Sequence, residues 1–140
     1  MSMKAITFFL FVLASAGCSA KADGPPAIQV DRTACAHCTM LVSDERFAAA
    51  YETAAGEARV FDDIGCLLDA ARKEASADTL RFWFHDALTG EWIRGDEAIF
   101  VRSDRVKTPM GGGILAYRDS QDPAAIRSVR ALLTETEKGR

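Results

Sequence analysis

The sequence lacks a strong charge bias. Its 140 residues carry 17 lysines and arginines against 20 aspartates and glutamates, so the formal net charge is −3. This balance excludes the strongly basic surface typical of nucleic-acid-binding proteins. An apolar share of 49% also excludes a wholly disordered acidic chain. The length allows one ordinary domain with a single core and excludes two large domains.

Signatures of several enzyme classes are missing as well. The sequence contains no hydrolytic triad pattern, no phosphate-binding glycine loop and no dinucleotide fingerprint. It also contains no internal repeat. Its longest apolar run, near the N-terminus, is shorter than the roughly 20 residues that a spanning helix needs. We therefore expect a binding protein and not an enzyme.

The N-terminus has the pattern of a secretory signal peptide. Lys4 precedes the apolar run 5–13, and the small residues 14–17 lead into Cys18. Small residues before a cysteine are typical of bacterial lipoproteins, in which Cys18 becomes the lipidated N-terminus, although Ser15 stands where that pattern usually has leucine. The alternative is cleavage by the general signal peptidase, which would leave Cys18 an ordinary thiol.

These features define the expected domains. Residues 1–17 form the signal peptide, residues 18–27 the lipidated cysteine and a flexible tether, and residues 28–140 the binding domain. The pair Pro25-Pro26 excludes a helix in the tether. We expect the domain to face the periplasm, anchored by its lipid to a bacterial membrane.

The pattern of apolar and turn residues predicts hairpins interrupted by helices. A helix is expected from Asp62 or Asp63 to Ala75, and another from Asp122-Pro123 onward. Alternation in 80–85 predicts a strand with one buried face, which places His85 on the other face. Further strands are expected at 47–53, 57–61, 92–93, 98–101 and 114–117. The fold class is α+β, with small, largely antiparallel sheets and two helices.

Sulfur ligands are concentrated between Cys35 and Met40. If the chain is extended from Cys38 onward, Cys38 and Met40 project from one face and offer a thiolate and a thioether. This pair suits Cu(I) better than Mg²⁺ or Ca²⁺, which prefer several oxygen ligands. Met110 lies between Pro109 and three glycines, on a loop that could supply a further thioether.

Other interpretations of Cys35 and Cys38 stay open. A zinc site would have to recruit Cys66 and a histidine, because the chain has no second Cys-x-x-Cys pair. A redox pair is disfavoured because the residues after Cys38 are a poor helix start. A structural disulfide is compatible with an oxidising compartment. Cys66 itself is expected to be a small buried apolar residue. His85, followed by Asp86, is either a ligand or a surface histidine.

Several ordered motifs resemble the nitrous-oxide reductase accessory lipoprotein family, NosL. That family has a lipoprotein signal, Cys-x-x-Cys-x-Met, an aspartate-rich turn into a helix, His-Asp, Gly-x-Trp and Pro-Met-Gly. One departure is Thr39, which stands where the family commonly has glycine. The matching stretches here are Cys35 to Met40, Phe61-Asp62-Asp63, His85-Asp86, Gly90-Glu91-Trp92 and Pro109-Met110-Gly111.

The resemblance implies a periplasm-facing Cu(I) chaperone that supplies copper for assembly of the nitrous-oxide reductase centres. Its partners would be copper, nitrous-oxide reductase or its maturation machinery, and the membrane. The family also resembles organomercurial lyases in fold. Carried over by position, Cys38, Met40 and Met110 are the expected ligands, with Cys35 and His85 secondary. The alternatives are a thiol-dependent lyase or oxidoreductase, and a structural lipoprotein stapled by a disulfide.

Overall fold

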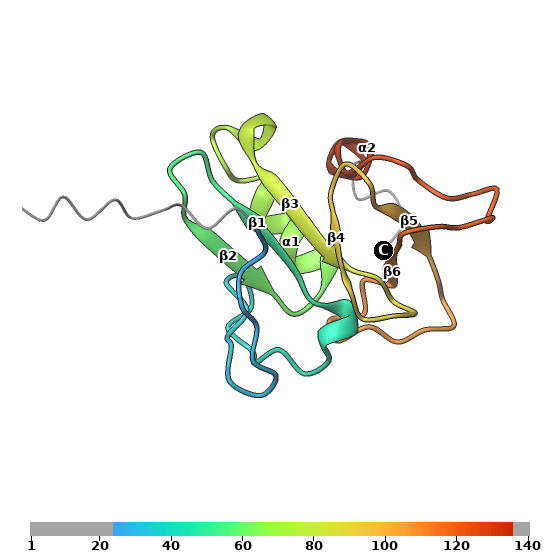
Figure 1. The fold of residues 1–140 in the computed structure, drawn as a ribbon, viewed down its shortest axis with the longest axis horizontal. Coiled ribbons are helices and arrows are strands. Elements are labelled where there is room, and N and C mark those ends of the chain that lie inside the picture. Colours follow the sequence, from blue (N-terminus) through green and yellow to red (C-terminus); the bar gives the residue numbers. More distant parts are fainter. Residues whose placement is uncertain (1–23, 136–140) are drawn as a thin grey trace, which may run out of the picture.

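A computed structural model describes residues 24–135, which form two antiparallel sheets and two short helices (Figure 1). The predicted α+β class is therefore confirmed. The predicted signal peptide and the lipidation site Cys18 lie outside the described residues. Within the described part, no helix is long and apolar enough to cross a membrane.

The larger sheet contains four antiparallel strands in the order β2-β1-β3-β4. Its strands are β1 (Ala49–Glu52), β2 (Ala58–Phe61), β3 (Arg81–His85) and β4 (Trp92–Arg94). Both predicted hairpins of this sheet are confirmed. The first strand starts later than predicted, because Glu45–Phe47 forms a 3₁₀ turn, η1, in which the side chain of Asp44 accepts a hydrogen bond from the Arg46 amide.

Strand β3 is buried on both faces, so the prediction of one buried face is wrong. Phe82 and Phe84 lie in the core as expected, but Trp83 is only 7% exposed and His85 only 1%. The ring of His85 lies against Trp92 of β4, with the ring centroids 3.7 Å apart. Turn η1 also contacts this strand. Neighbouring segments thus cover the face that alternation assigned to solvent.

Helix α1 (Ile64–Ala71) packs against β1 and β2 on one face of the larger sheet (Figure 1). The predicted helix is confirmed, and its apolar positions Ile64, Leu67, Leu68 and Ala71 are all buried. Asp63 is the N-cap, and its side chain accepts a hydrogen bond from the Gly65 amide. The helix ends at Ala71 instead of near Ala75.

The second sheet pairs β5 (Ile99–Arg102) with β6 (Ile114–Tyr117). Phe100 of β5 meets Phe84 of β3 edge to face, with ring centroids 4.8 Å apart, and thereby joins the cores under the two sheets. Such aromatic pairs typically add about 0.5–1.5 kcal/mol beyond their buried area. A bridge between Asp86 and Ala116 also links the chain after β3 to β6.

The last helix, α2 (Val129–Thr134), starts later than the sequence predicts. Asp122 caps only an isolated turn, through the Ala124 amide. Ile126 is not on the helix: its N–H and C=O pair with those of Phe100 at 2.8 Å each, which extends the second sheet. Ser128 is the actual N-cap. Pairing with Phe100 therefore replaces the first turn of the predicted helix.

Candidate metal centre

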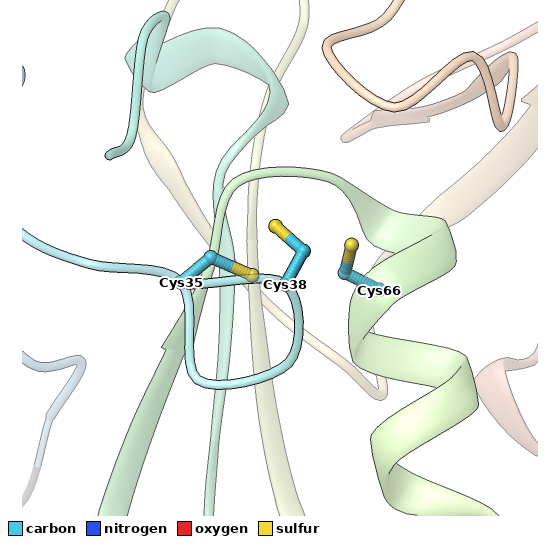
Figure 2. A group of neighbouring side chains, drawn as sticks. All are labelled: Cys35, Cys38 and Cys66. Atoms are coloured by element: carbon cyan, nitrogen blue, oxygen red, sulfur yellow. The ribbon is translucent and has the colours of Figure 1, made fainter. Parts of the chain in front are cut away.

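Three cysteines from two separate segments meet beside helix α1. Cys35 and Cys38 lie on the loop before β1, and Cys66 lies in the first turn of α1 (Figure 2). Their sulfur atoms all lie within 4.8 Å of one another, and all three thiols are free. Cys35 and Cys66 are buried, whereas Cys38 is half-buried. The arrangement could hold a thiophilic metal ion.

A tight turn presents the first two cysteines. The Thr39 amide donates to the Cys35 carbonyl at 3.0 Å, and the Cys35 amide donates to the Met40 carbonyl at 2.7 Å. The amide of Ala36 donates to Val60 of β2, which fastens the turn to the sheet. Thr39 has a φ of 66°, in the left-handed region that favours glycine. This conformation explains why glycine would suit the position better than threonine.

The turn contradicts the prediction of an extended chain from Cys38 to Met40. Alternation of side chains applies only to extended backbone, and the left-handed Thr39 interrupts it. Cys38 packs against the core, whereas Met40 is 55% exposed. The Cys38 thiol and the Met40 thioether therefore do not project from one face of a strand.

The environment of Cys35 favours its thiolate. Burial opposes ionisation, but backbone N–H groups of Cys38, Asp62 and His37 donate to its sulfur, and together they lower its pKa below the ordinary value. The other two thiols behave differently. Burial raises the pKa of Cys38, and the neighbouring Cys35 raises it further. Burial also raises the pKa of Cys66, and the charges of the other two cysteines add to this shift.

Two buried aspartates occupy the turn between β2 and α1. Asp62 and Asp63 are 1% and 0% exposed. An oxygen of Asp62 accepts from the amide of Ser43 at 2.9 Å and from its hydroxyl at 3.3 Å. In Asp63, Oδ1 accepts from the Gly65 amide at 2.7 Å and Oδ2 from the Met110 amide at 3.1 Å. The helix cap accounts only for the bond to Gly65, and the remaining bonds of the two aspartates hold the backbone at Ser43 and Met110.

The loop that carries Met110 is docked on the start of α1. Besides the bond to Asp63, the Gly112 backbone lies close to both Asp63 and Gly65, and a Cβ at Gly112 would come within 2.8 Å of Asp63 Oδ1. The Met110 side chain is 45% exposed. Met40 and Met110 therefore lie at the surface, each in a segment that touches the turn leading to Cys66.

His85 lies outside the cysteine group. Nδ1 is 2.9 Å from the carbonyl oxygen of Ala48, so Nδ1 carries the proton and donates it. Burial lowers the pKa of His85 below its ordinary value. Asp86 does not orient the ring as expected, since its carboxylate instead accepts from the amides of Leu88, Thr89 and Arg118. The surface interpretation of His85 is wrong, and its role as a ligand stays a prediction.

Cys66 is the residue that sequence reasoning missed. It was expected to be a small apolar core residue, and it is indeed buried, but its sulfur also faces two other thiols (Figure 2). The sequence around Cys66 carries no local signal for a ligand, because its position after the capping Asp63 fits the buried stripe of α1 equally well. Contact with Cys35 and Cys38 depends on the tertiary fold.

Comparison with solved structures shows what the chain resembles in fold. The crystal structure of the copper chaperone NosL from Shewanella denitrificans matches with a TM-score of 0.56 and 18% sequence identity. The match covers 71% of this chain and 83% of the other. The chain is similar in fold to NosL. The resemblance predicted from the motifs is thus supported at the level of the fold, and the likeness to organomercurial lyases stays a prediction. No protein-family model and no curated protein sequence matches the chain.

Proposed function

We propose that this chain is a Cu(I) chaperone that carries the ion on sulfur ligands beside helix α1. The observation that carries the proposal is the group of three free thiols within 4.8 Å of one another. Thiolate and thioether ligands select soft ions such as Cu(I). Likeness in fold to a copper chaperone supports the same function.

The composition of the group favours Cu(I) over zinc. A structural zinc site is usually closed by four nitrogen or sulfur ligands. Among the described residues, the group offers Cys35, Cys38 and Cys66 and no histidine. Met40 and Met110 lie in segments that contact the turn between β2 and α1, and their thioethers suit Cu(I). We propose Cys38, Met40 and Met110 as ligands, together with Cys35 and now Cys66.

Competitive titration tests the proposal. The reduced full-length chain should take one equivalent of Cu(I) from a chromophoric chelator and should bind Zn²⁺ far more weakly. Oxidation with a small disulfide should abolish copper binding, because the ligands are thiolates. Turnover of a dithiol or organomercurial substrate would favour the enzyme alternative instead. Failure of the fully reduced chain to bind Cu(I) would contradict the proposal.

We further propose that the copper is supplied to nitrous-oxide reductase during assembly of its copper centres, from the periplasmic side of a membrane. Support for this client comes from the motifs shared with NosL. The anchor is proposed from the small residues before Cys18. Cys18→Ser should release the protein from membranes. A variant that stays membrane-bound and fully processed would contradict the anchor but not the metal site.

A further inference from the structure

The turn between β2 and α1 reaches both methionine segments through adjacent side chains. Asp63 bonds to the backbone amide of Met110 itself. Asp62 bonds to the amide and hydroxyl of Ser43, three residues after Met40. Both aspartates are almost fully buried. One two-residue turn therefore contacts the two exposed thioether segments, and the same turn leads directly to the helix of Cys66 (Figure 2).

The hydrogen bonds of Asp63 tie both of its carboxylate oxygens to the backbone. Its two oxygens are engaged by two different N–H groups, one on the helix and one on the Met110 loop. A helix cap alone requires only the first bond. The second bond spans 47 positions of sequence and fixes the Met110 backbone relative to the first turn of α1.

The loop is shaped to fit this carboxylate. Gly112 sits so close that an added Cβ would lie 2.8 Å from Asp63 Oδ1 and 3.6 Å from the Gly65 Cα. Thr108, which is 6% exposed, closes the loop by accepting the Gly113 amide on Oγ1 at 3.0 Å. The loop therefore has one defined backbone position against α1, although the Met110 side chain is at the surface.

We propose that Asp62 and Asp63 are positioning residues for the two thioether ligands, Asp63 for Met110 and Asp62 for Met40. This inference rests on the proposed function, because it concerns the same Cu(I) site. The sulfur atoms bind the ion, and the carboxylates hold the backbone that presents the thioethers. Loss of a residue that orients a metal ligand typically lowers metal affinity about 10–100-fold.

The decisive variant is Asp63→Ser. Serine is a good N-cap, so its hydroxyl can still accept the Gly65 amide, but its short side chain has no second oxygen for Met110. Asp63→Asn is a second variant that keeps nearly the original volume. The matched variant for the Met40 segment is Asp62→Ala, which removes the contact with Ser43 and leaves the Met110 loop untouched.

Double-mutant cycles on Cu(I) affinity give the test. Asp63→Ser should weaken binding about 10–100-fold in the otherwise unchanged chain but far less when combined with Met110→Ala. Asp62→Ala should behave in the same way with Met40→Ala. The crossed pairs, Asp63→Ser with Met40→Ala and Asp62→Ala with Met110→Ala, should be additive. Additivity in the matched pairs would overturn the inference.

Two further readouts separate positioning from general stability and from the proposed function. X-ray absorption measures the number of sulfur ligands of the bound copper. This number should fall in Asp63→Ser. In the double variant Asp62→Ala with Met40→Ala, it should be the same as in Met40→Ala alone. In the metal-free protein, hydrogen exchange of the Met110 amide should accelerate in Asp63→Ser and stay unchanged in Asp62→Ala. An unchanged Met110 exchange rate would contradict the positioning role even if copper binds. Absence of Cu(I) binding in the unmodified chain would contradict the proposed function instead.

Discussion

Asp63 and Met110 are joined by a hydrogen bond of 3.1 Å between a buried carboxylate and a loop amide, 47 positions apart in the sequence. Sequence patterns identify the first residue as a helix cap and the second as a possible thioether ligand. The bond places the second beside the start of the helix that carries Cys66. It thereby connects the methionine loop to the cysteine group.

Met110→Ala should weaken Cu(I) binding while leaving the metal-free protein stable. The Met110 side chain is 45% exposed, so its loss should cost less than about 1 kcal/mol, against about 2–5 kcal/mol for a core methionine. Chelator competition measures the affinity, and thermal melting of the metal-free protein is the control. A sharp drop in melting temperature with unchanged affinity would mean that Met110 serves packing and not binding.

The glycines of the same loop should differ in their tolerance of alanine. Gly111 and Gly113 both have positive φ, 71° and 63°, so alanine strains the backbone by about 1–2 kcal/mol at either position. Only at Gly113 would the new Cβ also clash, 2.6 Å from the Ser103 carbonyl oxygen. Gly113→Ala should therefore lower the free energy of unfolding more than Gly111→Ala does in urea denaturation. Equal losses would contradict the loop conformation.

Cu(I) affinity should rise with pH. The pKa values of Cys38 and Cys66 are raised from an ordinary value of 9.0, so both thiols are protonated near neutral pH and must lose a proton to bind the ion. Each proton released should increase the affinity by up to about tenfold per pH unit between about pH 6 and 8. The slope should be shallower in Cys66→Ser. The same slope in that variant would show that Cys66 does not release a proton on binding.

Much of the fold could be predicted because its signals are local. The hairpin of β1 and β2 follows from two short runs around a turn, and the stripe of α1 follows from helical periodicity after Asp63. The candidate soft ligands could also be located, because Cys35, Cys38 and Met40 lie together in the chain. These features depend on residues a few positions apart.

Features created by distant contacts could not be predicted. His85 is buried because Trp92 and turn η1 cover a strand face that alternation assigns to solvent. Ile126 leaves the predicted helix because it pairs with Phe100. Cys66 has the sequence pattern of a core residue, and only the docking of the Cys35 turn on β2, through Ala36 and Val60, brings the other thiols to it.

In the proposed site, three thiols converge on one Cu(I) ion. The most direct measurement is the Cu(I) affinity of reduced Cys66→Ser, compared with Cys18→Ser as a matched control that removes the cysteine of the proposed lipid anchor. We expect Cys66→Ser to lower the affinity by at least about a hundredfold, which exceeds the usual effect of a supporting residue, and Cys18→Ser to leave the affinity unchanged. Unchanged affinity in Cys66→Ser would contradict the three-thiol site.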